Sequence, residues 1–423
     1  MKSPAMNIPI LDLKAQYAAI REEINQKVLA ILDSQNFILG AEVRALEEEI
    51  ASLSGTRFAV GVSSGSDALI ISLMALGVGA GDAVITTPFT FFATAGAIAR
   101  VGAELVFCDI DERTFNLDSE RLREVIERRM KRKPGRAGSR GKKGRGGKRT
   151  LRATGRRTGR EQAGQLKAVI PVHLYGQCAD MDPILAVAKE YGLAVVEDAA
   201  QAIGSEYPSQ RGVKKAGTMG ALGTLSFYPS KNLGGCGDGG MVLTESQKLA
   251  DKLRCLRQHG DTKKYYYKML GGNFRLDALQ AAILRVKLRH LNAWQAMRRE
   301  RATTYDRRFA ESGLVAAGLV KPPVAVYKNC GITNYHTFHQ YVVRAKKRDA
   351  LQAFLKEKGV GTSVFYPLPL HLQKCFAYLG YKRGDFPVSE RAAKEVLALP
   401  MYAELTPDQQ DYIISCFKQF YGN

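Results

Sequence analysis

The stretch "RFAVGVSSGSDALIISLMALGVGAGDAVIT" (residues 57–86) determines the fold class that we expect for this chain. An apolar, β-rich run at 57–62 leads through a turn of small residues into a helical segment at 66–77, and a second β-rich run follows at 82–86. A strand, a helix and another strand in this order are typical of a parallel sheet. The stretch therefore predicts the first strand–helix–strand unit of an α/β protein.

The same alternation continues along the chain, after two helical segments near the N-terminus at 13–32 and 43–53. It predicts a mainly parallel sheet with helices on both faces. The further β-rich runs lie at 103–110, 167–173, 193–198, 223–228 and 239–244, with another helical segment at 182–192.

The C-terminal part of the sequence predicts a second, smaller unit. A long helical stretch at 275–309 follows the sheet region and is a candidate bridge between two parts of the protein. A strand near 336–345, a helix near 348–359 and two later helices come after it. We therefore expect a large domain over residues 1–312 and a small α+β domain over 313–423.

A basic segment at 131–165 interrupts the sheet region. It holds fourteen Lys and Arg against one acid, so it carries +13 of the net charge of +21. Because it has almost no apolar residues, it cannot offset the entropy of ordering, and we expect a disordered loop. It is either a solvated insertion without a ligand or a contact for a polyanion such as nucleic acid, anionic lipid or an acidic partner. It has no aromatic residues for base stacking.

Composition indicates a soluble, cytoplasmic protein. The chain has 423 residues, of which 45% are apolar, and no apolar run has the roughly 18 residues of a membrane span. The N-terminus does not look like a signal peptide. The seven cysteines are scattered and form no CxxC pair, which argues against a zinc or redox motif.

The first candidate site is the turn "GVSSGSDAL" (61–69) between a strand and a helix. Backbone N–H groups and the helix dipole at such a turn, where the helix begins at about Ser66, favour an anion such as phosphate. A simple N-cap is the alternative interpretation.

The second candidate site is "VVEDAAQAIG" (195–204). Asp198 ends an apolar strand, where a carboxylate needs a cationic partner or several donors, and a protonated cofactor ring would supply one. Gln201 lies within reach of the same ligand. An N-cap role for Asp198 is the alternative.

The third candidate is Lys231 in "SFYPSKNLGGCGDGGMVLT" (226–244). An amine among small neighbours can have a lowered pKa and form a Schiff base, and the flanking Ser226 and Ser230 can hydrogen-bond a phosphate. A surface charge is the alternative. The stretch "TPFTFFATA" (87–95) offers an aromatic face for a planar ring, or else core packing.

Together these features meet the requirements of a pyridoxal phosphate site. Such a site needs a lysine for the cofactor carbonyl, an acid against the ring nitrogen, an aromatic on the ring and a phosphate cup. The lysine can then move the proton of the substrate carbon as a general base and acid.

The chain resembles the DegT/DnrJ/EryC1/StrS family of sugar aminotransferases, which are fold type I pyridoxal phosphate enzymes. The resemblance covers nearly the whole chain apart from the basic segment. It is carried by stretches such as "LDLKAQYAAIREEI", "VSSGSDALIISLMALGVGAGD", "PVHLYGQCADMDPI", "VEDAAQAIG", "SFYPSKNLGGCGDGGMV" and "NFRLDALQAAILRVKL".

The resemblance implies roles for matching positions. Lys231 matches the cofactor lysine, Asp198 the partner of the ring nitrogen, and Gln201 a contact to the ring face or its hydroxyl. Gly65, Ser66 and Ser226 match phosphate-binding positions. The remaining matches are Phe91 for the stacking aromatic, Asn273 for a residue that reaches a neighbouring subunit's phosphate, and His173 and Tyr175 near the substrate.

Two positions depart from the family pattern. Ser66 stands where many relatives have Thr, and this change keeps a hydroxyl group at the position. Phe365 stands where many relatives have His, near the end of the site that binds the sugar nucleotide, so the departure bears on the substrate. The basic segment is also not a usual family feature.

The resemblance implies a homodimer that transfers an amino group from L-glutamate to a keto sugar linked to UDP or dTDP. Its product would enter surface polysaccharide, lipopolysaccharide or glycosylated metabolite synthesis, and the motifs are most similar to members acting on 3-keto sugars, such as UDP-linked 3-keto hexuronates. The family's dehydratases have histidine at the position of Lys231, so the lysine favours transamination. A dehydratase of this fold, a non-catalytic regulator and a nucleic-acid-binding protein are the alternatives.

Overall fold

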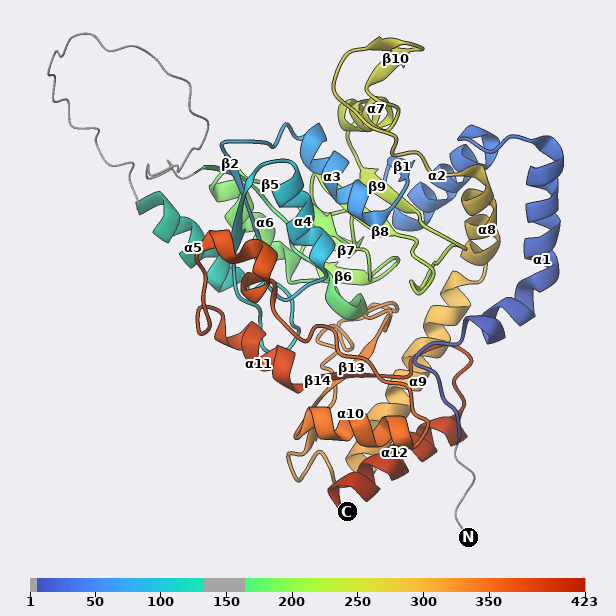
Figure 1. The fold of residues 1–423 in the computed structure, drawn as a ribbon, viewed down its shortest axis with the longest axis vertical. Coiled ribbons are helices and arrows are strands. Elements are labelled where there is room, and N and C mark those ends of the chain that lie inside the picture. Colours follow the sequence, from blue (N-terminus) through green and yellow to red (C-terminus); the bar gives the residue numbers. More distant parts are fainter. Residues whose placement is uncertain (1–5, 132–163, 423) are drawn as a thin grey trace, which may run out of the picture.

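A computed structural model describes residues 6–131 and 164–422, and a seven-stranded sheet forms its larger part (Figure 1). The strand order is β1-β9-β8-β5-β4-β2-β3, and only β9 runs antiparallel to its neighbours. The predicted mainly parallel sheet is confirmed. Its strands are β1 (Phe58–Val62), β2 (Asp82–Thr86), β3 (Glu104–Phe107), β4 (Gln165–Val169), β5 (Ala194–Asp198), β8 (Leu222–Ser226) and β9 (Gly240–Thr244).

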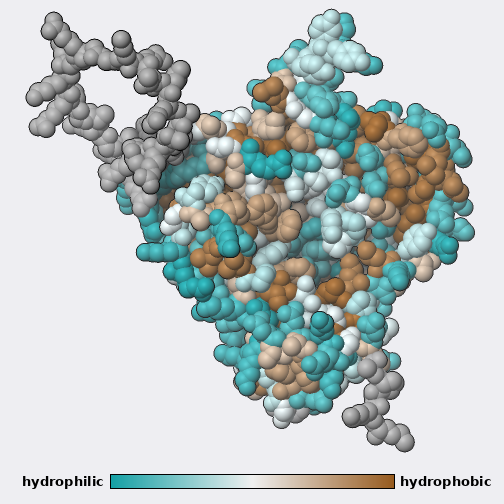
Figure 2. Space-filling view, viewed as in Figure 1, coloured by the Kyte–Doolittle hydropathy of each residue, from teal (hydrophilic) through white to brown (hydrophobic). Residues whose placement is uncertain are grey.

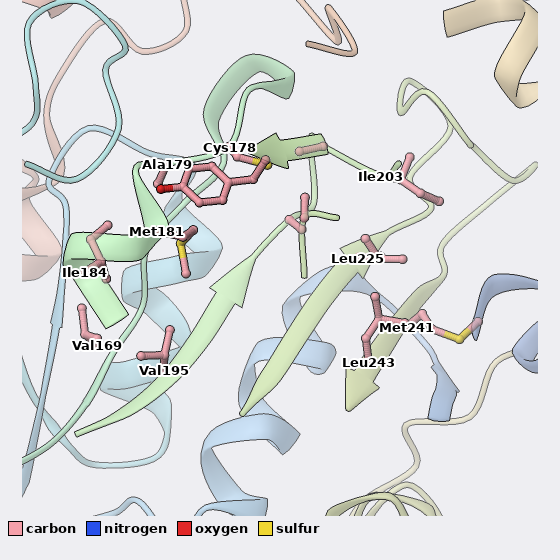
Figure 3. Close-up of a cluster of buried hydrophobic side chains, with 14 of the residues drawn as sticks. Val169, Cys178, Ala179, Met181, Ile184, Val195, Ile203, Leu225, Met241 and Leu243 are labelled. Atoms are coloured by element: carbon pink, nitrogen blue, oxygen red, sulfur yellow. The ribbon is translucent and has the colours of Figure 1, made fainter. Parts of the chain in front are cut away.

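Helices cover both faces of this sheet, because successive strand residues point to opposite sides. In β9, Met241 and Leu243 enter one apolar cluster, whereas Val242 enters the other. Figure 3 shows the first cluster, in which Met241 and Leu243 lie with Leu225. The helices are α1 (Leu13–Ser34), α2 (Gly40–Ser54), α3 (Gly65–Ala75), α4 (Phe92–Arg100), α5 (Ser119–Lys131), α6 (Met181–Glu190), α7 (Gln247–Leu256) and α8 (Ala278–Leu288).

A smaller antiparallel sheet lies at the lower end of Figure 1. Its core is aromatic, with the rings of Tyr305 and Tyr341 stacked 4.8 Å apart. Ile8 near the N-terminus joins this core, and its N–H donates to the Gly359 carbonyl at 2.8 Å. The elements are β12 (Val320–Lys321), β13 (Tyr341–Ala345), β14 (Val396–Leu399), α10 (Arg348–Glu357), α11 (Pro387–Glu395) and α12 (Pro407–Tyr421).

The long helical stretch expected at 275–309 is two helices. α8 ends at Leu288 and α9 (Leu291–Glu311) begins three residues later, extending toward the small sheet (Figure 1). At the break, His290 N–H donates to the Lys287 carbonyl, a short-range bond that ends the α-helical pattern. We propose the domain boundary after residue 312, with the segment around Ile8 packed on the C-terminal unit.

The predicted disordered loop falls mainly at residues 132–163, outside the described residues, and stays a prediction. Two hairpins were not predicted: β6 (Glu206–Ser209) with β7 (Gly212–Lys215), and β10 (Asp261–Lys263) with β11 (Tyr266–Tyr267), which projects at the top of Figure 1. Short 3₁₀ turns lie at Leu174–Gly176, Leu370–Leu372 and Lys374–Leu379. Within residues 6–131 and 164–422, no helix has the length and apolarity needed to cross a membrane.

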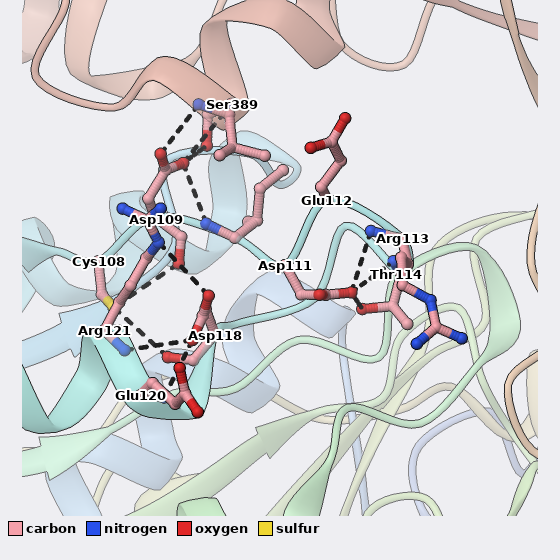
Figure 4. A network of polar contacts seen from close by, with 12 residues as sticks. Cys108, Asp109, Asp111, Glu112, Arg113, Thr114, Asp118, Glu120, Arg121 and Ser389 are labelled. Carbon is pink, nitrogen blue, oxygen red and sulfur yellow. Dashed lines mark hydrogen bonds and ion pairs between the residues drawn. The ribbon is translucent and has the colours of Figure 1, made fainter.

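Asp109, just after β3, ties the large sheet to α11 (Figure 4). Its buried carboxylate accepts hydrogen bonds from the N–H groups of Val388 and Ser389, each at 3.0 Å, and from the Ser389 hydroxyl at 2.6 Å. Carboxylates are favourable at helix N-termini, where the backbone N–H groups have no intrahelical partner. Asp109 therefore fixes α11 beside the carboxyl ends of the strands, where the predicted site residues lie.

We predict that Asp109→Ala lowers the free energy of unfolding by about 3 kcal/mol, because it leaves buried donors without a partner. The matched control is Asp111→Ala. Asp111 also accepts from two N–H groups and one hydroxyl, those of Arg113 and Thr114, but only within its own turn and closer to solvent. Urea unfolding followed by circular dichroism compares the two. Equal losses would contradict the role assigned to Asp109.

Candidate active site

A cavity of about 800 Å³ opens at the carboxyl ends of the parallel strands. Because these strands share one direction, residues that follow β1, β5 and β8 meet at the same edge of the sheet. Loops of the C-terminal part close the other side. The predicted site residues that line the cavity are Gly65, Ser66, Phe91, Asp198, Gln201, Ser226, Lys231 and Phe365.

The turn between β1 and α3 forms one wall of the cavity. Ser64 is the N-cap of α3 and accepts a hydrogen bond from the Asp67 N–H at 3.0 Å. A Cβ on Gly65 would lie 2.7 Å from the Cβ of Ser226, so only glycine lets this turn approach β8 so closely. The turn brings the N-terminus of α3 beside Ser226, and this arrangement suits a phosphate.

Asp198 ends β5 at the back of the cavity and is 6% exposed. Its Oδ2 accepts from the Thr94 hydroxyl at 2.8 Å, and its Oδ1 accepts from the Ala200 N–H at 3.2 Å. These bonds orient the carboxylate, and its remaining lone pairs can face a cationic ring nitrogen. Thr94 lies in the "TPFTFFATA" stretch, where only the aromatics drew attention, so its role was missed.

Lys231 follows β8 in a tight turn, with its N–H donating to the Tyr228 carbonyl at 2.8 Å. Burial lowers the pKa of its amine to about 8, against the opposing effect of the Asp198 charge. Helix α8 holds the glycine-rich loop beyond it: Gln280 accepts from the Cys236 N–H, and Lys287 donates to the Gly234 carbonyl, each at 2.8 Å. The loop thus fixes the lysine that reaches into the cavity.

Gln201 links the large sheet to the C-terminal part. Its Oε1 accepts from the Tyr175 N–H at 2.7 Å, and its Nε2 donates to the Tyr366 hydroxyl at 3.2 Å. Tyr366 lines the cavity, and its ring centre lies 6.3 Å from that of Phe91. Phe91 itself is 56% exposed at the start of α4. Tyr366 was not singled out in the sequence, because only long-range packing brings its loop here.

Three predicted residues do not line the cavity. Tyr175 is buried beside it and donates its hydroxyl hydrogen to the Phe365 carbonyl, so it supports the wall from behind. His173 is fully buried: Nδ1 accepts from the Ala179 N–H at 3.0 Å, and Nε2 lies 2.8 Å from a Glu197 carboxylate oxygen. Asn273 is exposed elsewhere on the chain, and its contact with a neighbouring subunit stays a prediction.

The lining residues suit pyridoxal phosphate. The Gly65 turn can hold the phosphate, Asp198 the ring nitrogen and Lys231 the carbonyl carbon. The close approach of Gly65 to Ser226 and the lowered pKa of Lys231 are both features that such a site needs. The residues present therefore fit this cofactor.

The sequence and the fold are similar to those of known aminotransferases. The pattern of the DegT/DnrJ/EryC1/StrS aminotransferase family matches residues 18–418. A Geobacillus stearothermophilus protein named pleiotropic regulatory protein is 47% identical, over 98% of this chain and 99% of the relative. The UDP-N-acetyl-3-dehydro-alpha-D-glucosamine 3-aminotransferase of Acidithiobacillus ferrooxidans is 41% identical over 95% of each chain. The structure of DesV from S. venezuelae in complex with a ketimine intermediate superposes with a TM-score of 0.83, at 33% identity over 99% of each chain.

The lowered pKa of Lys231 predicts a pH profile for the protein without cofactor. The neutral amine is the nucleophile, so acylation of Lys231 by a small reagent should rise with pH and reach half its maximum near pH 8, whereas ordinary lysines need a pH near 10.5. Removing the Asp198 charge in Asp198→Asn should move the midpoint below 8. Peptide mass spectrometry measures the midpoint of Lys231 acylation in the parent protein and in Asp198→Asn. A midpoint near pH 10 in the parent protein would refute the lowered pKa of Lys231.

We predict that Gly65→Ala weakens retention of pyridoxal phosphate by roughly tenfold to a hundredfold, because the added methyl pushes the turn away from Ser226. Gly79→Ala is the matched control, since its Cβ would meet nothing closer than the Val101 carbonyl at 3.7 Å. Cofactor absorbance after dialysis reports the loss. Equal retention in the two variants would show that the close approach is not needed.

Proposed function

The chain belongs to the DegT/DnrJ/EryC1/StrS aminotransferase family, and on this premise we propose how its cavity works. The protein is a pyridoxal phosphate-dependent aminotransferase of nucleotide-linked sugars. We propose L-glutamate as the amino donor. The observation that carries the assignment is Lys231, a half-buried amine of lowered pKa in one cavity with Asp198 and the N-terminus of α3.

Each wall of the cavity has a task in this reaction. When bound, pyridoxal phosphate supplies a carbonyl for the amine and a protonated ring that withdraws electrons. Asp198 would hold the protonated ring nitrogen, and the N–H groups of the α3 turn would hold the phosphate. The Lys231 amine, which is partly neutral near pH 8, removes and returns the proton at the substrate carbon.

The cavity supports a neutral sugar as substrate. Among its described lining residues, Lys231 is the only lysine or arginine, and that amine is needed for the chemistry. The wall around Phe365 is apolar, with Leu368 and Leu370 beside it. A sugar carboxylate placed against this apolar wall would lose hydration without a polar partner there. We therefore propose an uncharged 3-keto sugar, as in the name of the Acidithiobacillus relative, rather than the 3-keto hexuronate that the motifs suggested.

We also propose a cytoplasmic homodimer with its sites at the interface. Figure 2 shows apolar side chains gathered over the side of the molecule where α1 lies. Leu29 and Ile38 on this side are each 58% exposed, and apolar side chains gathered on one face are typical of an interaction site. All seven cysteines are free thiols, in agreement with a reducing compartment.

Other functions have less support. The Geobacillus relative is named as a regulatory protein, but this chain has the lysine, the acid and the phosphate turn that catalysis needs. Lys231 also favours transamination over dehydration. A polyanion contact through the basic segment remains a prediction, because residues 132–163 lie outside the described structure.

The test is transfer of ¹⁵N from labelled L-glutamate to UDP- and dTDP-linked 3-keto sugars, read by mass spectrometry. We expect labelled amino sugar from neutral substrates, at least about tenfold less from the 3-keto hexuronate, and a loss of roughly 10³-fold in Lys231→Ala. Label in no sugar, from protein that holds its cofactor, would overturn the aminotransferase assignment. Preference for the hexuronate would overturn only the neutral-sugar assignment.

A further inference from the structure

The residue after Lys231 makes a hydrogen bond that fixes the proton on a cavity histidine. Asn232 is 5% exposed, and its Nδ2 donates to the Thr337 carbonyl at 2.9 Å. Its Oδ1 therefore faces Nδ1 of His339, at 3.1 Å. The opposite amide orientation would place two oxygens against each other at Thr337. Since an amide oxygen only accepts, Nδ1 of His339 carries the proton.

With the proton on Nδ1, Nε2 of a neutral imidazole has a free lone pair. His339 lines the cavity, and no hydrogen bond from another described residue reaches its Nε2. Burial and the positive charges of Lys231 and Arg298 hold the pKa of His339 well below its usual value, so the ring stays neutral. Arg298 also donates to the carbonyls of Phe338 and His339, at 3.0 and 3.5 Å, which fixes the backbone behind the ring.

We propose that Nε2 of His339 accepts a hydrogen bond from a hydroxyl group of the sugar substrate, with Asn232 fixing the tautomer that makes this possible. The inference rests on the proposed function, because it needs a substrate that carries hydroxyls. A sugar hydroxyl is a good donor to a neutral imidazole nitrogen. The carboxylates of glutamate only accept, and its amine is the group that reacts. His339 therefore acts in the sugar half of the reaction and not in the glutamate half.

Two variants separate this role from a structural one. His339→Asn keeps a donor near the position of Nδ1, so it preserves the contact with Asn232 but removes the acceptor at Nε2. His339→Gln does the reverse, because its amide oxygen reaches the Nε2 position while the contact with Asn232 is lost. Each half-reaction is followed in single turnovers of the holoenzyme by the visible absorbance of the cofactor.

We expect His339→Asn to raise the sugar concentration for half-maximal rate by about tenfold, with the glutamate half-reaction changed less than twofold. His339→Gln should stay within about threefold of the unmodified protein in both halves. A purely structural role predicts the reverse order, with His339→Gln the more impaired, and that result overturns the proposal. Equal losses in both half-reactions overturn it as well. If the parent protein aminates no sugar, that result overturns the proposed function, and the role of His339 falls because it rests on that function.

A second readout does not depend on activity. The chain has six histidines, and ¹⁵N spectra of histidine-labelled protein report the tautomer of each ring. The signal that disappears in His339→Gln should show a protonated Nδ1 and an unprotonated Nε2 at pH 7. A proton on Nε2, in either the other tautomer or the imidazolium, would overturn the proposal even if the protein is an active aminotransferase.

Discussion

The close approach of the β1–α3 turn to strands β8 and β9 is the constraint on which the site depends. A Cβ on Gly65 would lie 2.7 Å from Ser226, and one on Gly240 would lie 2.4 Å from the Ser64 carbonyl oxygen. These glycines let a helix N-terminus lie against the end of β8, directly before the turn that carries Lys231. An anion site and a reactive amine are therefore held at one edge of the sheet by backbone packing alone. Parallel β5 then adds Asp198 at the same edge.

The cavity needs both parts of the chain. The large sheet supplies the phosphate turn, the carboxylate and the amine, while Phe365, Tyr366 and His339 come from the C-terminal part. The two sides are joined by hydrogen bonds that end in the cavity wall: Gln201 with Tyr366, Tyr175 with Phe365, and Asn232 with His339. Residues that hold the two parts of the chain together thus also line or support the cavity wall. We therefore expect a substitution at one of them to change both the packing of the two parts and the choice of sugar substrate.

The sequence predicted what is local and missed what is long-range. Asp198, Lys231 and the Gly65 turn follow short apolar, β-rich runs, and the C-terminal ends of parallel strands meet at one edge of the sheet. Thr94, Tyr366 and His339 carry no such mark, because their roles arise only when distant segments pack. The long helical stretch expected at 275–309 is divided into α8 and α9, because apolar periodicity does not reveal the break near His290. His173 lies in a family motif near the site, yet burial and its bond to Glu197 keep it off the cavity wall.

The proposed chemistry depends on Lys231 as the residue that binds the carbonyl of pyridoxal phosphate. Borohydride reduction of the holoprotein, followed by peptide mass spectrometry, tests it most directly. We expect the reduced cofactor to be attached to the peptide containing Lys231, and we expect no modified peptide from a Lys231→Ala protein. Cofactor attached to another lysine, or none attached to a protein that still transaminates, would contradict it.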